Sequence, residues 1–332
     1  MAADRGFPDL PTIQAALEVA CRAPSVHNTQ PWRWVIGDRS VHLFADRSRT
    51  LPVIDRTGRE LTISCGAALH HARVAFRASG WRPDVRRLPN PADADHLAAI
   101  ELAPLPRIDQ RMIGLTSASV DRRADRRPFL PDGIPAHLLN QLLGAAATEH
   151  AAVIALRDPA QRRETLTALA HADSVQRQNP MYEAELAEWS GVRLGSRHGV
   201  PVRNAPSVAQ GGRGLVGRNF GPGELEMPPP LDDGATLFLI STEVDDAASW
   251  LHTGEALSAL LLNATKNGLA SCPLSQVAEV RTARDLVRHL VLSGRGEPQL
   301  VVRVGWPATA AYPGPATPRR PLDEVLSTWR DR

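Results

Sequence analysis

The sequence predicts an α+β protein in which one structural unit occurs twice, as an intrachain pseudo-dimer. Helical and strand-like segments alternate along the chain, and a short motif recurs at an offset of 188 residues. The motif is Gly66–Leu69 in one helical segment and Gly254–Leu257 in another. The alternative is a chance likeness between two alanine-rich helices. On the repeat interpretation, residues 1–105 form a first, partly degenerate unit, and residues 106–332 form a second.

The first unit should begin with a helix over about Pro11–Arg22, because Leu17 and Ala20 lie on an apolar stripe and Pro11 suits a first turn. Two short strands, Trp32–Ile36 and Val41–Phe44, are expected next, joined by a turn. The other elements expected in this unit are a helix over about 59–79 and strands near 85–88 and 97–102.

The second unit is expected to hold helices over about 106–122, 135–147, 160–177, 247–267 and 283–292, and strands at 153–156, 236–240 and 300–304. The segment of about 191–234 is rich in Gly, Pro and Arg. A structureless stretch of that length inside a compact chain is usually a functional cover loop or a disordered insert. The tail from Trp306 to Pro321 holds five prolines and should be extended.

Charge and cysteine content narrow the function classes. The formal net charge is +2, from 38 basic and 36 acidic residues, which is too balanced for a general nucleic-acid or membrane binder. No apolar run approaches the length of a membrane span, and the N-terminus has no apolar core typical of a signal peptide. Three cysteines without a CxxC pair favour a reduced, cytoplasmic compartment.

An arginine cluster follows the helix predicted at about 106–122. Four arginines lie within six residues: Arg122, Arg123, Arg126 and Arg127. Because guanidinium groups pair with phosphate bidentately, the cluster favours a phosphate clamp, with Arg319-Arg320 as a second candidate wall. The alternative is a solvated basic face that Asp121 and Asp125 neutralise.

The loop Pro24–Trp32 is framed by prolines and holds small hydrogen-bonding side chains. Ser25, Asn28 and Gln30 both donate and accept, so they suit the carbonyls and ring nitrogens of a planar heterocycle. The alternative is a satisfied turn that caps a helix. His27 is either a general acid that contacts a substrate or a plain loop histidine.

Two other motifs carry little weight. Gly212-x-Gly214-x-x-Gly217 matches the dinucleotide fingerprint in letters, but no strand precedes it and no helix follows it. His70 and His71 are neighbours on a predicted helix, so they point to different faces and cannot share a metal ion. We therefore expect no metal site.

Five stretches of the chain resemble the FMN-dependent nitroreductase superfamily in the right order. They are Ala23–Trp32, Arg123–Phe129, Gly268–Leu274, Gln299–Pro307 and Arg319–Val325. The first is similar to the superfamily's P-S-x-x-N-x-Q-P-W loop, and the second to its phosphate motif. The resemblance is greatest to the Acg family, in which two nitroreductase-like units are fused in one chain.

The resemblance implies a nitroreductase-like fold with FMN at the interface between units, and a chain that is a monomer acting as a pseudo-dimer. It implies contacts to the flavin ring and ribityl from Pro24, Ser25 and Asn28, with Gln30 in the same loop. Arg123 and Arg127 would hold the phosphate beside Arg319 or Arg320, although Asp125 stands where the superfamily often has serine. Pro273, Leu274 and Ser275 would line the ring edge, with the Ser275 N–H near N5.

Three functions remain open at this point. The first is an FMN oxidoreductase that takes hydride from NAD(P)H and reduces a nitroaromatic or quinone-like small molecule at a single composite site. The second is an FMN-binding or sequestering protein in which the segment 191–234 covers the flavin and turnover is small or absent. The third is a structural protein without flavin. The first two differ in whether a hydride donor can reach the ring.

Overall fold

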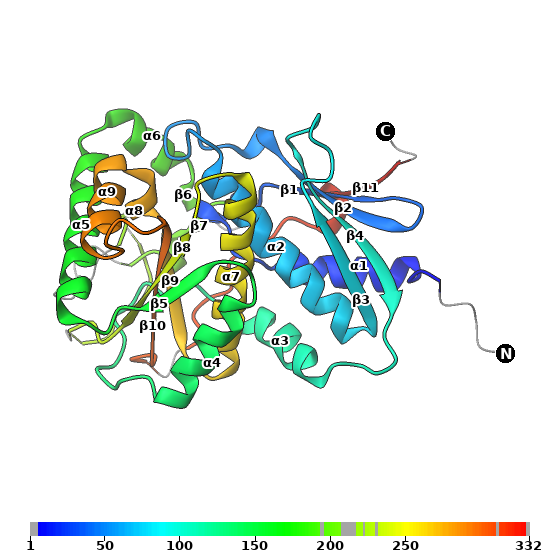
Figure 1. Ribbon diagram of the computed structural model, residues 1–332. Coiled ribbons are helices and arrows are strands. Elements are labelled where there is room, and N and C mark those ends of the chain that lie inside the picture. The colour runs from blue at the N-terminus through cyan, green and yellow to red at the C-terminus, as the bar shows by residue number, and fades with distance from the viewer. Residues whose placement is uncertain are drawn as a thin grey trace.

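Two long helices, α2 (Arg59–Ala78) and α7 (Ala247–Lys266), lie side by side through the middle of the molecule, between two β-sheets (Figure 1). The computed structural model describes residues 6–192, 196–206, 217–221, 223–229, 232–309 and 312–329. Both helices are buried along most of their length. They are the two helices that the 188-residue repeat predicts.

The first sheet has the strand order β11-β1-β2-β4-β3. Its strands are β1 (Trp32–Ile36), β2 (Ser40–Ala45), β3 (Trp81–Arg87), β4 (His96–Pro104) and β11 (Leu326–Thr328). Helix α1 (Leu10–Ala20) and α2 share one buried core with this sheet, which includes Leu17, Trp34 and Phe76. Strand β11 pairs with β1 in parallel, so a strand from near the end of the chain lies at the edge of the first sheet.

The second sheet is antiparallel, with the order β5-β8-β10-β9. Its strands are β5 (Ala152–Ala155), β8 (Thr236–Thr242), β9 (Ala270–Leu274) and β10 (Glu297–Gly305). Phe238 and Ile240 share a core with α7, whereas Leu237 and Leu239 share a core with the helices of the opposite face. The apolar run of β8 is continuous because both faces of this sheet are covered.

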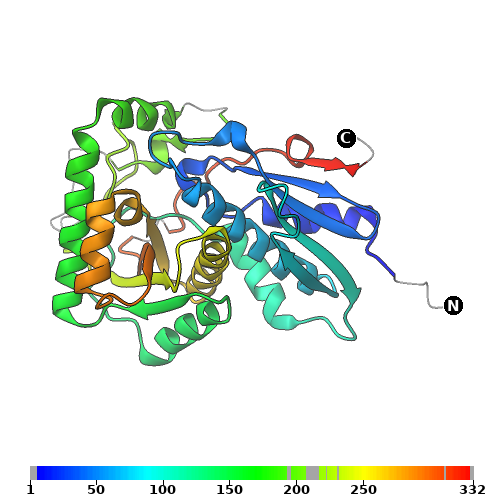
Figure 2. The same cartoon turned by 45° about the horizontal axis from the view of Figure 1, so that its top comes forward.

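The remaining helices surround the second sheet and join the two halves. They are α3 (Gln110–Asp121), α4 (Ala136–Ala147), α5 (Pro159–Arg177), α6 (Pro180–Glu188), α8 (Gln276–Glu279) and α9 (Arg281–Leu290). Helix α4 packs with α7 on one face, and α5 and α9 cover the other (Figure 2). Helix α3 begins at Gln110 rather than near Pro106, because the Asp109 carboxylate caps it by accepting from the Arg111 N–H.

Two glycines allow α2 and α7 to approach each other closely where they cross. A Cβ at Gly66 would lie 2.2 Å from the carbonyl oxygen of Leu251, and one at Gly254 would lie 2.0 Å from that of Ile63. The two contacts correspond to each other, because Gly254 lies 188 positions after Gly66 and Leu251 lies 188 positions after Ile63. Such reciprocal contacts are typical of an interface with two-fold symmetry. They support the predicted pseudo-dimer, and the α+β prediction itself is confirmed.

The expectation that the segment 191–234 is structureless is revised for its described parts. These contain β6 (Ser190–Val192), β7 (Val200–Pro201) and a 3-10 turn at Val202–Asn204, so the segment is not structureless throughout. Residues 212–216 of the glycine fingerprint lie outside the described residues.

No helix in the described part of the chain is both long and apolar enough to cross a membrane.

Candidate functional site

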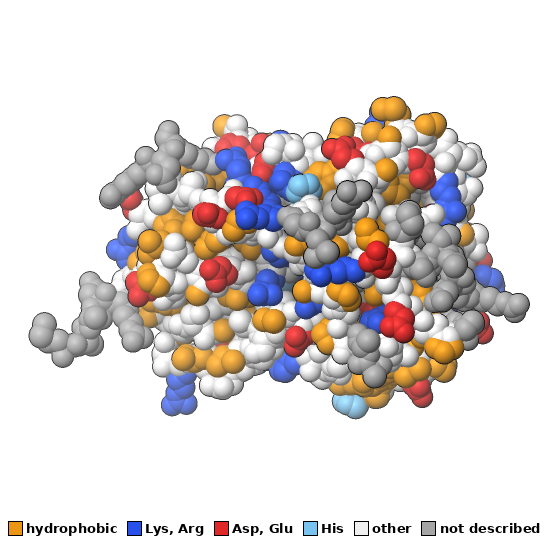
Figure 3. Space-filling model, turned by 180° about the vertical axis from the view of Figure 1, so that it is seen from behind, with side chains coloured by type: hydrophobic (Ala, Val, Ile, Leu, Met, Phe, Trp, Pro, Cys, Tyr) orange, Lys and Arg blue, Asp and Glu red, His pale blue; other side chains and the backbone are white. Residues whose placement is uncertain are grey.

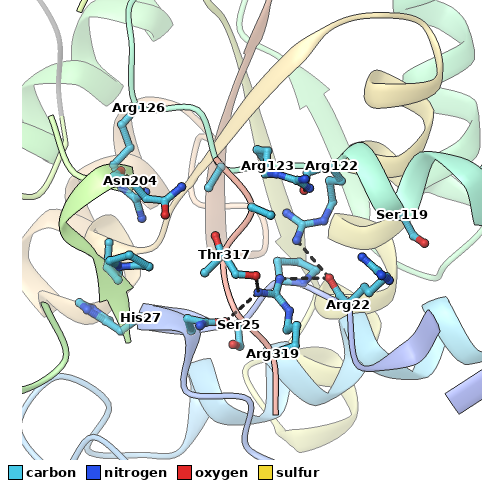
Figure 4. A pocket seen from close by; sticks show the side chains of 16 residues that line it. Arg22, Ser25, His27, Ser119, Arg122, Arg123, Arg126, Asn204, Thr317 and Arg319 are labelled. Atoms are coloured by element: carbon cyan, nitrogen blue, oxygen red, sulfur yellow. Dashed lines mark hydrogen bonds between the residues drawn. The ribbon is translucent and has the colours of Figure 1, made fainter. Parts of the chain in front are cut away.

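Two adjoining cavities lie where the two halves of the molecule meet. The first, which we call the arginine cavity, encloses about 680 Å³ of space that is partly open to solvent (Figure 4). Its polar lining comes from the end of α1, the loop after it, the end of α3 and the segment after it, the 3-10 turn at Val202–Asn204, and the tail: Arg22, Ser25, His27, Asn28, Ser119, Arg122, Arg123, Arg126, Asn204, Thr317 and Arg319. On the face seen in Figure 3, basic side chains gather near the middle of the molecule.

The second cavity, which we call the mixed cavity, encloses about 640 Å³ and has more apolar walls. Its lining comes from both units: Val26, Glu60, Ile63, Ser64, Arg218, Phe220, Leu257, Pro273, Ser275 and Leu300. Five further residues line both cavities: Pro24, Ser25, His27, Ala124 and Arg126. The two cavities are therefore direct neighbours.

The loop between α1 and β1 has a strained backbone. His27, Asn28 and Gln30 have φ values of 46°, 57° and 53°, in the left-handed region that non-glycine residues seldom adopt. A hydrogen bond helps to hold this strained conformation, since the Ser25 Oγ accepts from the Gln30 N–H at 3.0 Å. Strained backbone of this kind clusters at functional sites.

Asn28 ties the loop to the tail of the chain. Its Nδ2 donates to the carbonyl oxygens of Gly199 and Pro318, each at 3.1 Å. Its Oδ1 accepts from Arg319 Nη1 at 3.0 Å. Asn28 therefore lines the arginine cavity and also fixes the guanidinium beside it.

The guanidinium groups of the arginine cavity lack carboxylate partners. Within the described ranges, no Asp or Glu forms an ion pair with any of its five arginines, and none lines the cavity. Arg122 is 5% exposed, and burial together with the charge of Arg123 lowers its pKa to about 10. Burial, Arg122, Arg123 and Arg22 lower the pKa of Arg319 to about 9. The cavity therefore concentrates positive charge at neutral pH, and the charges of Asp121 and Asp125 act on it only from outside the lining.

Two of these buried groups have unpartnered donors. The Nε atoms of Arg122 and Arg319 have no hydrogen-bond partner. Their Nη2 atoms both donate to the carbonyl oxygen of Arg22, at 3.2 Å in each case (Figure 4). Arg123 is held by carbonyl groups too, since it donates to Val120, Arg122 and Gly314. An anion in this cavity would meet guanidinium groups that are already positioned.

Arg127 and Asp125 line neither cavity. The Arg127 Nε and Nη2 donate to the two carboxylate oxygens of Asp125, at 2.8 and 2.7 Å, and both side chains are buried. We therefore revise the expectation that Arg127 contacts a phosphate. Its guanidinium neutralises Asp125 instead, which explains why a carboxylate is tolerated beside an arginine cavity.

The other sequence-predicted residues divide between the cavities and their support. Pro273 and Ser275 line the mixed cavity, whereas Leu274 points into the core of the second sheet. Gln30 lies outside both cavities, where its Oε1 accepts from the Arg320 N–H at 2.8 Å. The Arg320 side chain turns away toward Asp46 and Glu324. Of the two tail arginines, Arg319 is the one that lines the arginine cavity.

Described parts of the segment 191–234 close the sides of both cavities. Val200, Pro201 and Asn204 line the arginine cavity. Arg218 and Phe220 line the mixed cavity, where Arg218 pairs with Glu279 and donates to Ser275 Oγ at 2.9 Å. The Phe220 ring packs edge-on against His27, with centroids 5.7 Å apart.

Two titratable groups of the mixed cavity are held neutral. Burial and the charges of Arg218 and Arg126 keep the pKa of His27 well below 6.5, and both of its ring nitrogens lack a partner. Burial, then Glu279 and Asp55, raise the pKa of Glu60 well above 4.5, and its Oε1 is also unpartnered. These orphaned polar atoms face a space that a polar ligand can fill.

Sequence reasoning did not assign several lining residues to the site. They are Arg22, Ser119, Asn204, Thr317, Arg218, Phe220 and Glu60, together with Arg122 and Arg126, which it placed only in the arginine cluster. Most of them lie at element ends or in coil, where no periodic pattern marks them. The clustering of the arginines was the one signal available.

At the position that the repeat relates to the mixed cavity, the described residues form a network of ion pairs. Ser64 lines the mixed cavity, and its counterpart 188 residues later is His252, which lies 3.5 Å from Glu255. Glu255 is fully buried and accepts two hydrogen bonds from Arg87, at 2.8 and 2.9 Å, and one from Arg73 at 2.7 Å. Arg73 also bonds Glu149 at 2.5 Å.

The amino-acid sequence of this chain is similar to those of known proteins. The model of the nitroreductase family matches residues 120–306. A Mycobacterium tuberculosis H37Rv protein, provisionally named NAD(P)H nitroreductase Rv3131, is 42% identical over 324 residues, which cover 96% of this chain and 92% of that one. The provisionally named NAD(P)H nitroreductase acg of the same strain is 38% identical, covering 95% of each chain.

Solved structures give a weaker likeness. The structure of the FMN-dependent nitroreductase NfnB from Mycobacterium smegmatis in complex with NADPH is 21% identical and superposes with a TM-score of 0.42. The superposition covers 64% of this chain and 98% of that one.

Proposed function

We propose, from the premise that this chain belongs to the nitroreductase family, that the two cavities together hold one FMN. On this proposal the chain is an NAD(P)H-dependent oxidoreductase that reduces nitroaromatic or quinone-like small molecules. The observation that carries the proposal is the adjacency of the two cavities: one is lined by arginines and, among the described residues, by no carboxylate, and its neighbour has more apolar walls.

The arginine cavity suits the FMN phosphate. Phosphate oxygens accept strong, charge-assisted hydrogen bonds, and guanidinium groups offer them in a fixed fork. Arg122 and Arg319 are buried or partly buried, have unpartnered Nε donors, and are oriented by the Arg22 carbonyl. We therefore assign the phosphate to Arg122, Arg123 and Arg319, while Arg127 supports the wall from behind through Asp125.

The mixed cavity suits the flavin ring. Ile63, Leu257 and Leu300 supply apolar walls, while Pro273 and Ser275 stand at its edge. Pro24 and Ser25 line both cavities, so they would contact the ligand where the ring meets its chain. When bound, FMN supplies the two-electron redox chemistry, and the protein supplies its position and electrostatic surroundings.

Both units contribute to this site, which supports a single composite FMN site per chain. The first unit gives the strained loop and Ile63, and the second gives the arginines, Leu257 and Pro273. The place that the repeat relates to it holds the Arg73–Glu149–Glu255–Arg87 ion pairs. Because these buried charges are already paired with one another, they are not available to bind a second FMN phosphate there.

A second candidate function is FMN binding with little or no turnover. One observation favours it, namely that Arg218 and Phe220 of the segment 191–234 pack against the mixed cavity and are held there by Glu279 and His27. A flavin that is covered in this way would be shielded from a nicotinamide. Anaerobic titration of the FMN-loaded protein with NADPH separates the two candidates. Bleaching of the flavin absorbance is expected for the reductase, and unchanged bands would establish the binding function.

FMN binding itself is tested by two neighbouring variants. Arg319→Gln removes a guanidinium from the arginine cavity, whereas Arg320→Gln removes one that turns toward Asp46. We expect Arg319→Gln to weaken FMN binding about tenfold or more, since a charge-assisted bond to phosphate is lost. Arg320→Gln should change it little. The measurement is quenching of FMN fluorescence on titration with protein, and equal effects of the two variants would contradict the assignment.

A further inference from the structure

The arginine cavity carries more positive charge than one FMN phosphate balances. Among the residues that the structure describes, its lining holds no carboxylate and five guanidinium groups: Arg22, Arg122, Arg123, Arg126 and Arg319. A phosphate monoester carries up to about two negative charges at neutral pH, so about three positive charges stay unbalanced. Clustered like charges at a partly buried site are unfavourable unless a further anion joins them.

We propose that the mouth of this cavity binds a second phosphate, the 2′-phosphate of NADPH, chiefly through Arg22 with Arg123 beside it. The inference rests on the proposed function and makes it more specific, because it assigns a preference for NADPH over NADH to named residues. NADH has a hydroxyl group where NADPH has the phosphate, so a free guanidinium at this place distinguishes the two donors.

The arginines are arranged in an inner and an outer group. Arg122 is 5% exposed and lies at the inner wall, whereas Arg22 is an exposed residue at the cavity's edge. The inner pair, Arg122 and Arg319, is positioned by backbone carbonyls and by Asn28. The inner group therefore suits the resident FMN phosphate, and the outer group suits a ligand that arrives from solvent.

Arg22 is the arginine that is free to receive this ligand. Among the residues that the structure describes, its side chain has neither a hydrogen-bond partner nor an ion-pair partner, although it lines the cavity. Its carbonyl oxygen accepts from both inner arginines, and that contact survives any side-chain substitution. Removing the Arg22 guanidinium thus changes the outer charge, while the backbone contact that positions the inner pair is kept.

One hydroxyl group of the lining can add to the recognition of a phosphate. Ser119 and Thr317 line the same cavity as Arg22, from α3 and from the tail. The Ser119 Oγ already donates its proton to the Thr116 carbonyl oxygen at 2.6 Å, whereas Thr317 offers a hydroxyl donor to phosphate oxygens. The cavity therefore combines fixed donors with unpaired positive charge.

The test measures nucleotide binding to the FMN-loaded protein rather than turnover. Adenosine 2′,5′-bisphosphate and adenosine 5′-monophosphate are titrated by isothermal calorimetry. We expect the bisphosphate to bind about tenfold tighter, because it alone carries the 2′-phosphate. Arg22→Gln should abolish that difference, and the FMN content of the variant is checked by absorbance before the titration. Arg107→Gln, at an exposed arginine that lines neither cavity, should leave both affinities as they are.

Three results would overturn the inference: equal affinities for the two nucleotides, a difference that persists in Arg22→Gln, or inorganic phosphate binding as tightly as the bisphosphate. The last result would show a simple anion site without nucleotide recognition. Failure of the proposed function is a separate observation, since the protein would then not bind FMN in the loading step that precedes the titration.

Discussion

Glu60 is a carboxyl group without a partner inside the mixed cavity. It is 4% exposed, its Oε1 has no hydrogen bond, and the nearby carboxylates of Glu279 and Asp55 oppose its ionisation. Burial is the largest cause that raises its pKa, and Arg218 opposes the rise without cancelling it. The protonated form is therefore the one that the folded protein prefers.

The sign of the resulting pH dependence follows from linkage. A carboxyl group whose pKa is raised on folding stabilises the protein at low pH, and that contribution is lost as the pH rises above the ordinary value of 4.5. Glu60→Gln keeps the shape of the neutral acid and cannot ionise. We expect the variant to be more stable than the parent at mildly alkaline pH, and the difference to shrink as the pH falls. Urea unfolding at several pH values checks this, and parallel stability curves would contradict it.

Single residues show how far a sequence pattern specifies a site. The cluster Arg122–Arg127 indicated a phosphate clamp, and three of its four arginines line the arginine cavity. Arg127 does not, because Asp125 is two positions away and accepts from its guanidinium at 2.7 and 2.8 Å. Which arginine pairs with the carboxylate depends on the backbone after α3, and composition alone carries no such information.

Among the elements, the crossing of α2 and α7 depends on two glycines. Added Cβ atoms at Gly66 or Gly254 would lie 2.2 and 2.0 Å from backbone carbonyl oxygens, which cannot move as a flexible side chain would. We expect Gly66→Ala to destabilise the protein by about 1–3 kcal/mol or more, as overpacking does. The measurement is the free energy of unfolding in urea.

Gly144 is the matched control for this prediction. It lies within α4, is exposed, and an added Cβ would meet nothing within 4 Å. Gly144→Ala should therefore stabilise the protein by up to about 1 kcal/mol through helix propensity alone. A loss of stability at Gly144 equal to that at Gly66 would show that the crossing is not the cause.

Elements with a strong local pattern could be predicted, and those that depend on distant partners could not. The helix expected at 59–79 is α2, Arg59–Ala78, because a continuous apolar pattern and Gly80 mark it. Strand β9 was missed since Pro273 argues against a strand, but β9 lies at a sheet edge, where proline is tolerated. Strand β11 exists through pairing with β1, where the Trp34 N–H donates to the Val325 carbonyl oxygen at 2.7 Å.

At the scale of the whole molecule, the site depends on segments far apart in the sequence. The loop after α1, the end of α3 and the tail near Arg319 meet at one cavity, and β11 returns the chain end to the first sheet (Figure 1). We propose that this arrangement makes one chain do the work of a dimer. The α+β class, the locally patterned elements and the separate motifs could be predicted from the sequence, but the meeting of these distant segments is a property of the folded chain.

The central claim is that one chain binds one FMN at a composite site. The measurement that tests it most directly is a titration of the flavin-free protein with FMN, followed by sedimentation equilibrium of the loaded protein. The account predicts saturation at one FMN per chain and a particle with the mass of a single 36.0 kDa chain plus its flavin. Saturation at two FMN per chain, or FMN binding only by a dimer of chains, would contradict it.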